Sequence, residues 1–361
     1  MNMKWSLKLF RFSGIEVSVH FTFLLLIAWF GYIYWVNTGS VAAVFSGIGF
    51  ILSLFVCVVL HEFGHALTAK RYGIQTRSIT LLPIGGVAQL DKMPDDPRQE
   101  IRVALAGPAV NIVIAIFLWL LLSLTQGPVS LEQLDITTDS FLTKLMIVNV
   151  FLAVFNLLPA FPMDGGRVLR AWLALHVDHA LATKTAAVIG QSLALVMGVL
   201  GFLYNPILLF IALFVWIGAA AEAGAEQIKL VLSRIPISRA MLSDFQVLST
   251  SDTLSHAVDL TLAGSQKDFP VLENGQLVGV VIQSDLLDGL RRYGENSEVE
   301  KIMQRDVPTV DINEHLERVT EQLENSQCRL IGITHNGQLV GILNLDNVME
   351  LFQFYRALHE K

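Results

Sequence analysis

An apolar segment from Val41 to Leu60 runs directly into the pentapeptide His61-Glu62-Phe63-Gly64-His65. A segment of this length can cross a lipid bilayer as a helix. On a helix the two histidines share one face, one turn apart. Both imidazoles can therefore bind the same zinc ion while the glutamate between them serves as a general base. Because ionisable groups beside a membrane-length apolar segment are costly and usually functional, the sequence predicts a zinc centre on a membrane helix.

The composition is that of a membrane protein. Of the 361 residues 53% are hydrophobic and 16% are charged, and the mean hydropathy is +0.54. These values exclude an ordinary soluble protein. No basic block and no interleaving of basic and aromatic residues points to a nucleic acid partner. We expect a polytopic α-helical membrane domain over residues 1–232, with about six transmembrane segments: Ile15–Val36, Val41–Leu60, Ile101–Leu124, Phe141–Leu175 (interrupted), Leu181–Phe202 and Ile207–Ala225.

The positions of lysine and arginine predict the orientation of these segments. The loops Asn37–Ser40, Thr125–Ser140 and Tyr204–Pro206 carry neither residue. The positive-inside rule therefore places both termini in the cytoplasm and the chain in the cell membrane. The basic residues that set this orientation are Lys4, Lys8 and Arg11 before the first segment, Lys70, Arg71, Arg77, Lys92, Arg98 and Arg102 after the second, and Arg167, Arg170 and Lys184 after the fourth.

Two short stretches between the predicted spans are not simple helices. Residues Ser78–Leu90 have the pattern of a strand, a Pro-x-Gly-Gly turn and a second strand. This hairpin either re-enters the membrane beside the zinc motif or forms a cytosolic loop, and the sequence leaves both readings open.

The second stretch, Asn156–Arg167, contains two prolines and two glycines that break the fourth apolar segment. Asp164 in this stretch falls on the same side of the membrane as His61 and His65. Its carboxylate can supply the third protein ligand of a catalytic zinc, whose fourth position is left for water. The alternative is an ordinary turn at the end of a helix.

Four motifs together resemble the site-2 protease family of intramembrane zinc metalloproteases. They are the zinc pentapeptide, Leu82-Pro-Ile-Gly-Gly86, Ala106-Gly107-Pro-Ala-Val-Asn111 and the stretch from Asn156-Leu-Leu-Pro to Met-Asp164-Gly165, in the family's order. The resemblance implies one zinc ion per chain on His61, His65 and Asp164, with Glu62 as the base. It further implies that Asn156 binds the substrate backbone or polarises its carbonyl, and that Asn111 is a further substrate-binding position. The implied substrate is a single-span membrane protein, cut within the lipid bilayer.

The C-terminal third contains an internal repeat. The hexapeptide Asn-Gly-Gln-Leu-Val-Gly occurs at Asn274 and again at Asn336, a period of 62 residues. Each copy has the pattern helix, strand, Asn-Gly hairpin, strand, helix. The pair resembles tandem cystathionine-β-synthase (CBS) domains, which we place at residues 236–295 and 296–355 as an α/β module.

CBS pairs often bind adenine nucleotides. Asp285 lies at the family's ribose-binding position in the first copy, and Asn347 is its counterpart in the second. The usual hydroxyl position is Ile282 in the first copy and Asn344 in the second. The sequence therefore leaves two readings open: an adenine nucleotide sensor, or a purely structural pair that joins two chains into a homodimer.

We considered two other functions. A CBS-regulated transporter or channel would carry paired ionisable residues along several spans or repeated halves, and neither is present. A catalytically inactive scaffold would most simply lack Glu62 or one of the three ligands, and all four residues are present. The sequence does not identify the substrate.

Overall fold

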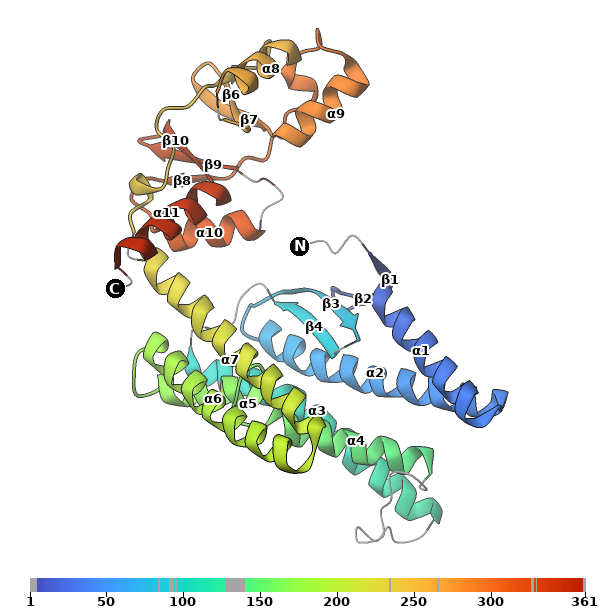
Figure 1. Ribbon diagram of the computed structural model, residues 1–361. Coiled ribbons are helices and arrows are strands. Elements are labelled where there is room, and N and C mark those ends of the chain that lie inside the picture. Colours follow the sequence, from blue (N-terminus) through green and yellow to red (C-terminus); the bar gives the residue numbers. More distant parts are fainter. Residues whose placement is uncertain are drawn as a thin grey trace. The chain divides into compact units, whose positions relative to one another are not determined.

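The computed structural model describes residues 5–359 apart from residues 84, 91–93, 95, 127–139, 234, 265, 326, 327 and 329. The chain forms two compact units, Met1–Gly224 and Ala225–Lys361 (Figure 1). Helix α7 (Pro206–Leu232) crosses the boundary, so its last two turns belong to the second unit.

The first unit is mainly helical and confirms the predicted class. Five described helices are long and apolar enough to cross a membrane: α1 (Phe21–Thr38), α2 (Val41–Lys70), α3 (Pro97–Gln126), α6 (His179–Tyr204) and α7. Helix α4 (Phe141–Asn156) is apolar but has 16 residues, and α5 (Asp164–Ala174) follows it after a break. The fourth predicted segment is thus two helices, because Pro159 and Pro162 interrupt it.

The first predicted span was wrong at its start. Residues Ile15–His20 form strand β2, and α1 begins only at Phe21. The strand forms because β2 pairs with β1 (Ser6–Phe12) on one side and with β3 (Thr76–Leu82) on the other.

The predicted hairpin is the far half of the same sheet. Strand β4 (Gly85–Leu90) pairs antiparallel with β3, and the strand order is β1-β2-β3-β4. The side chains of Val17 and Ile79 pack on Phe63 and Ala66 of α2. The sheet therefore covers one side of α2, and the two histidines lie on a different side.

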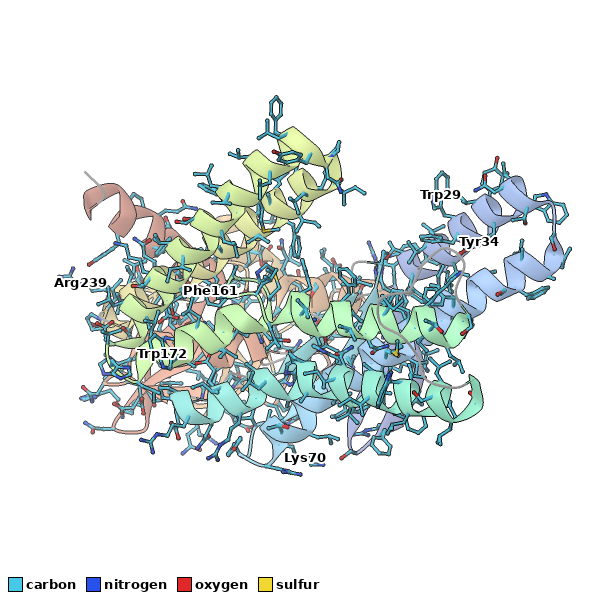
Figure 2. The ribbon with its side chains drawn as sticks, turned by 90° about the horizontal axis from the view of Figure 1, so that it is seen from below. Trp29, Tyr34, Lys70, Phe161, Trp172 and Arg239 are labelled. Atoms are coloured by element: carbon cyan, nitrogen blue, oxygen red, sulfur yellow. The ribbon has the colours of Figure 1, made fainter. Side chains whose placement is uncertain are left out.

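Helix α3 lies among α2, α4 and α5 and contacts all three, and α5 also contacts α6. Figure 2 shows Trp29 and Tyr34 on α1 toward the turn into α2, with Lys70 at the far end of α2. Aromatic residues at one end of the α1–α2 pair and a cation at the other are typical of a membrane hairpin.

The second unit contains the two predicted copies. The first consists of β5 (Leu248–Ser249), α8 (Leu254–Ala263), β6 (Phe269–Glu273), β7 (Gln276–Val281) and α9 (Gln283–Tyr293), with strand order β5-β6-β7. The second consists of β8 (Thr309–Asp311), α10 (Leu316–Asn325), β9 (Leu330–His335), β10 (Gln338–Asn344) and α11 (Leu345–His359), with order β10-β9-β8. Asn274 and Asn336 adopt positive φ angles in the hairpin turns, as the repeated Asn-Gly predicts.

The two copies exchange short segments. The turn η3 (Val299–Lys301) and Met303 pack into the core of the first copy. The turn η2 (Ile237–Arg239), at the start of the first copy before β5, packs into the core of the second. The core of each copy therefore includes a short segment that is adjacent in sequence to the strands and helices of the other copy. The two copies fold together as one body for this reason.

Candidate metal centre

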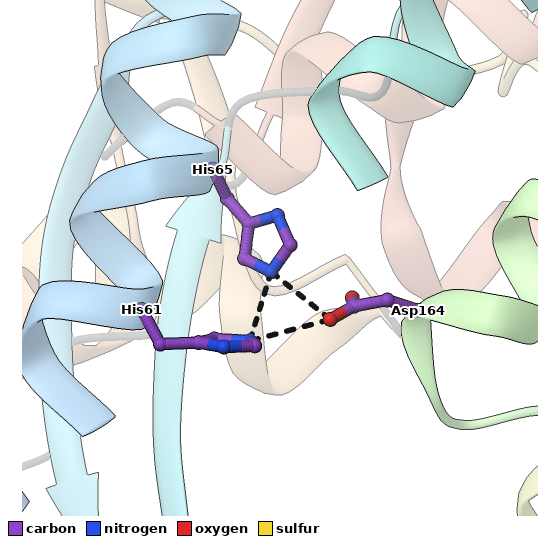
Figure 3. A group of neighbouring side chains, drawn as sticks. All are labelled: His61, His65 and Asp164. Atoms are coloured by element: carbon purple, nitrogen blue, oxygen red, sulfur yellow. Dashed lines mark hydrogen bonds and ion pairs between the residues drawn. The ribbon is translucent and has the colours of Figure 1, made fainter. Parts of the chain in front are cut away.

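Helix α2 places His61 and His65 one turn apart on a buried face. Their side chains belong to residues that are only 7% and 8% exposed. The two Nε2 atoms lie 3.1 Å apart. Asp164, the first residue of α5, brings its Oδ2 to 3.2 Å from Nε2 of His61 and 3.1 Å from Nε2 of His65 (Figure 3). The structure therefore brings together the three residues predicted as metal ligands, although His65 and Asp164 are 99 residues apart in sequence.

Asp164 is held there by a buried ion pair further along α5. The Nε of Arg170 donates to Oε1 of Glu100 on α3 at 2.9 Å, and its Nη1 donates to Oε1 of Glu222 on α7 at 2.6 Å. The guanidinium also lies 5.4 Å from the centre of the Phe161 ring, in the loop that precedes α5. These contacts add charged anchors to a short helix that also packs on α3 and α6.

The second nitrogen of each imidazole has its own partner. His65 Nδ1 lies 2.7 Å from the backbone carbonyl oxygen of Val103, and His61 Nδ1 lies 2.5 Å from Oδ1 of Asn111. A carbonyl oxygen only accepts, so each Nδ1 carries the proton and donates. Each Nε2 then presents a lone pair toward the Asp164 carboxylate, as a neutral imidazole does when it binds a metal.

This donor set fits zinc. Two imidazole nitrogens and a carboxylate oxygen, all electron-rich, lie within 3.2 Å of one another and repel unless a cation lies among them. Ligands about 2.0–2.1 Å from a tetrahedral zinc are separated by about 3.3 Å, close to the separations found here. Three protein ligands leave the fourth position open, as in catalytic zinc sites.

The absence of a side chain at Gly107 makes room for the two rings. A Cβ atom placed on Gly107 of α3 would lie 2.6 Å from Nε2 of His61 and closer still to the imidazole of His65. Any other residue at this position would push the imidazoles out of the site.

Glu62 lies beside the histidines on α2 and is partly exposed. The backbone of β4 packs directly against it: a Cβ on Gly86 would lie 2.8 Å from Cγ and 3.3 Å from Oε1 of Glu62. In the described part of the sheet, β4 is an edge strand, paired only with β3. An extended peptide chain beside β4 would therefore lie next to the Glu62 carboxylate.

The other predicted site residues are spread over both units. Asn156 ends α4, and its Nδ2 donates to the carbonyl of Leu152 at 3.0 Å. Asn111 is completely buried and supports His61, and no part of it is exposed to a substrate in this structure.

The two predicted nucleotide contacts lie in the second unit. Asp285 accepts a hydrogen bond from Gln304 at 2.7 Å. Asn347 exchanges two hydrogen bonds with Asn344 at the start of α11, and both of these bonds lie within its own copy.

Sequence reasoning missed several residues around the metal centre. Glu100 and Arg170 were assigned no role at the site, Gly107 was noted only as part of a motif, and Asn149 on α4, whose Oδ1 accepts a hydrogen bond from Nδ2 of Asn111 at 3.0 Å, was not singled out. Asn149 had a usable signal: it is an amide inside a membrane-length apolar segment, where polar groups are costly. The other three act through contacts between distant helices, which no local pattern predicts.

Comparison with known proteins identifies the family of the chain. The model of Peptidase family M50 matches residues 49–144 and 123–201, and the CBS domain model matches residues 237–292 and 299–353. The zinc metalloprotease MJ0392 of Methanocaldococcus jannaschii is 33% identical over 361 residues, covering 99% of both chains. The chain belongs to peptidase family M50. A solved site-2 protease from the same organism is 40% identical, covers 61% of this chain and 95% of its own, and superposes with a TM-score of 0.45.

Membership in the M50 family implies zinc as the cofactor, and the cluster formed by His61, His65 and Asp164 could hold a metal ion. The predicted combination of an M50 domain with a CBS pair is confirmed by the two family models. The transporter alternative finds no support among these relatives.

Proposed function

We propose that this M50 chain is a zinc metalloendopeptidase that hydrolyses peptide bonds within transmembrane segments of other membrane proteins, in regulated intramembrane proteolysis. The observation that carries the proposal is the buried cluster of three metal donors, all within 3.2 Å of one another, on helices that belong to a membrane domain. A metal centre inside the membrane domain acts on peptide bonds that a soluble protease cannot reach.

Each site residue has a separate role in peptide-bond hydrolysis. His61, His65 and Asp164 would hold the zinc, which when bound would supply Lewis-acid polarisation of the scissile carbonyl and a water nucleophile near neutral pH. Glu62 takes a proton from the attacking water and delivers it to the leaving amine nitrogen. Asn156 binds the substrate backbone near the scissile bond, since its side-chain oxygen has no partner among the described residues. Stabilisation of the negative charge that develops on the scissile carbonyl oxygen and positioning of the general base together lower the activation barrier of peptide hydrolysis.

The substrate must be locally extended, because a peptide bond inside a helix is shielded by its own hydrogen bonds. We propose that the edge of β4 holds the extended segment by strand addition. The contact of Gly86 with Glu62 supports this arrangement, because it puts the edge strand beside the base. A single-span membrane protein is the simplest substrate of this kind.

We further propose that both termini and the CBS pair are cytoplasmic. The distribution of lysine and arginine supports this orientation. Reporters fused after Ser233 should be active in the cytoplasm, while a reporter inserted within residues 131–139 should be active only outside it. A cytoplasmic signal from the latter position would reverse the proposed orientation.

The CBS domains at residues 236–295 and 296–355 are proposed to regulate the protease or to join two chains. Asp285 and Asn347 are the proposed nucleotide contacts. The interlocked cores support a pair that moves as one body, as either role requires.

The activity is tested by replacing Glu62 with glutamine. Glu62→Gln should retain about one zinc ion per chain and lose proteolysis, because the amide keeps the shape of glutamate but cannot accept the proton. Membrane proteomics of cells with Glu62→Gln should show single-span fragments that are absent from cells with the wild-type chain. The matched control is Glu16→Gln, a partly exposed glutamate paired with the exposed Lys8, which should behave as wild type. Wild-type proteolysis by Glu62→Gln, or purified wild-type chain without zinc, would refute the proposal.

A further inference from the structure

A line of buried polar side chains leads away from the metal centre across three helices. It starts at His61 on α2, continues through Asn111 on α3 and ends at Asn149 on α4. Both asparagines are completely buried, with 0% exposure. Burying an amide in an apolar region costs several kcal/mol unless it is hydrogen-bonded, so each atom of these amides must have a partner.

The distances show that nearly every partner is present. His61 Nδ1 lies 2.5 Å from Oδ1 of Asn111. Asn111 Nδ2 donates to Oδ1 of Asn149 at 3.0 Å. Asn149 Nδ2 in turn donates to the backbone carbonyl of Leu145 at 2.8 Å and to the Cys57 sulfur at 3.4 Å.

The direction of all these bonds follows from the last one. The carbonyl of Leu145 can only accept, so the NH₂ group of Asn149 must face it. The oxygen of Asn149 then faces Asn111, which must present its own NH₂ group there. Asn111 therefore offers its oxygen to His61, and His61 must carry its proton on Nδ1. That tautomer is the one that leaves Nε2 unprotonated for a metal.

We propose that Asn149 is a positioning residue for the metal centre, which sets the tautomer and the orientation of His61 through Asn111. The inference rests on the proposed zinc site and goes beyond it by assigning a role to a residue on α4, which contributes no ligand. Supporting residues of this kind typically change metal affinity about 10–100-fold when they are removed. A merely structural hydrogen bond between helices would instead lower stability and leave the zinc affinity unchanged.

The test measures zinc affinity of the full chain in detergent by competition with a chelating indicator. Asn149→Leu should raise the zinc dissociation constant about 10-fold or more, because the Asn111 amide is no longer held in one orientation. The matched control is Thr143→Val on the same helix, a buried polar side chain that bonds to Ser140 and has no link to His61. It should bind zinc as tightly as wild type even if it unfolds at a lower temperature.

A second substitution should rescue the first. In Asn149→Leu/Asn111→Asp either carboxylate oxygen accepts the proton of His61 Nδ1, so the orientation no longer depends on Asn149, and the zinc affinity should return to the wild-type range. If Asn149→Leu does not accumulate, Asn149→Ala, which adds no bulk, is measured in the same way.

Three results would overturn the inference: wild-type affinity in Asn149→Leu, no rescue by Asn111→Asp, or an equal loss of affinity in Thr143→Val. If the wild-type chain bound no zinc, the proposed function would be refuted, and the inference about Asn149 would fail with it. The two failures are therefore distinguishable.

Discussion

At the scale of single residues, the metal centre depends as much on an absent side chain as on the ligands. Gly107 lies against both imidazoles, and a Cβ there would overlap them. Glycine inside a helix costs about 1 kcal/mol relative to alanine, so its presence in α3 is unfavourable for the helix alone. The close approach of the two imidazoles to the α3 backbone offsets this cost.

Gly107→Ala should therefore stabilise α3 as an isolated helix but disrupt the arrangement of the two imidazoles in the metal centre. We expect zinc affinity to fall by at least the 10–100-fold typical of a lost supporting contact, with proteolysis lost in proportion. The control is Gly49→Ala in α2, where a Cβ would meet no atom within 4 Å. It should keep both zinc and activity. Zinc affinity measured by chelator competition for the two variants decides the point, and equal affinities would contradict the packing argument.

At the scale of secondary-structure elements, α5 is the one whose position needs explaining. It is short, it follows a break in the chain, and its first residue is a metal ligand. Its anchor is Arg170, which is 5% exposed, bonded to Glu100, which is 1% exposed. A buried pair of this kind contributes little net stability, but removing one partner leaves the other charge buried and uncompensated.

Arg170→Leu should thus destabilise the membrane domain by about 3–5 kcal/mol. Unfolding in detergent, followed by intrinsic fluorescence, measures the change. Arg170→Leu/Glu100→Leu removes both charges and should recover part of the loss. The exposed pair Lys8–Glu16 serves as the comparison, since Lys8→Ala should cost no more than about 1 kcal/mol. Equal stability of Arg170→Leu and Lys8→Ala would show that the buried pair does not anchor α5.

At the scale of the whole molecule, the two CBS copies share a fold but differ at the proposed nucleotide contacts. The 62-residue repeat relates Gln304 in one copy to Leu242 in the other. Gln304 bonds to Asp285, while its counterpart Leu242 is apolar and packs in the core between the copies. Of the two proposed contacts, Asp285 has a carboxylate and Asn347 an amide, and at Asp285 the side chain of Gln304 would compete with a ribose.

This asymmetry predicts how nucleotide binding responds to substitution. Calorimetry of the full chain with ATP, ADP and AMP should show weak binding that Asp285→Ala abolishes. Gln304→Ala should strengthen binding about fivefold, because a competing hydrogen bond of about 1 kcal/mol is removed. Asp288→Ala, an exposed aspartate on the same helix, is the control and should have no effect. The absence of binding at millimolar nucleotide would leave the pair a dimerising or substrate-positioning module.

What the sequence determined by itself was local or periodic. The spacing of His61 and His65 gives one helical face, the apolar run before them gives a membrane helix, and the repeated Asn-Gly gives two hairpins. Each of these follows from the residues within one turn, one span or one repeat. Asp164 as a third donor followed from the order of the segments and from the resemblance to a family.

The other features of the fold and of the site depended on contacts between segments far apart in the chain. Ile15–His20 alternates apolar and polar residues, and its pairing with β1 and β3 makes it a strand that precedes α1. Three features of the site depend on contacts between two or more helices. They are the direction of the hydrogen bonds along Asn149, Asn111 and His61, the space at Gly107, and the anchoring of α5 by Glu100. Propensity and periodicity describe one segment at a time, so they contain no information about which buried donor meets which acceptor. Only the folded packing of the helices decides that.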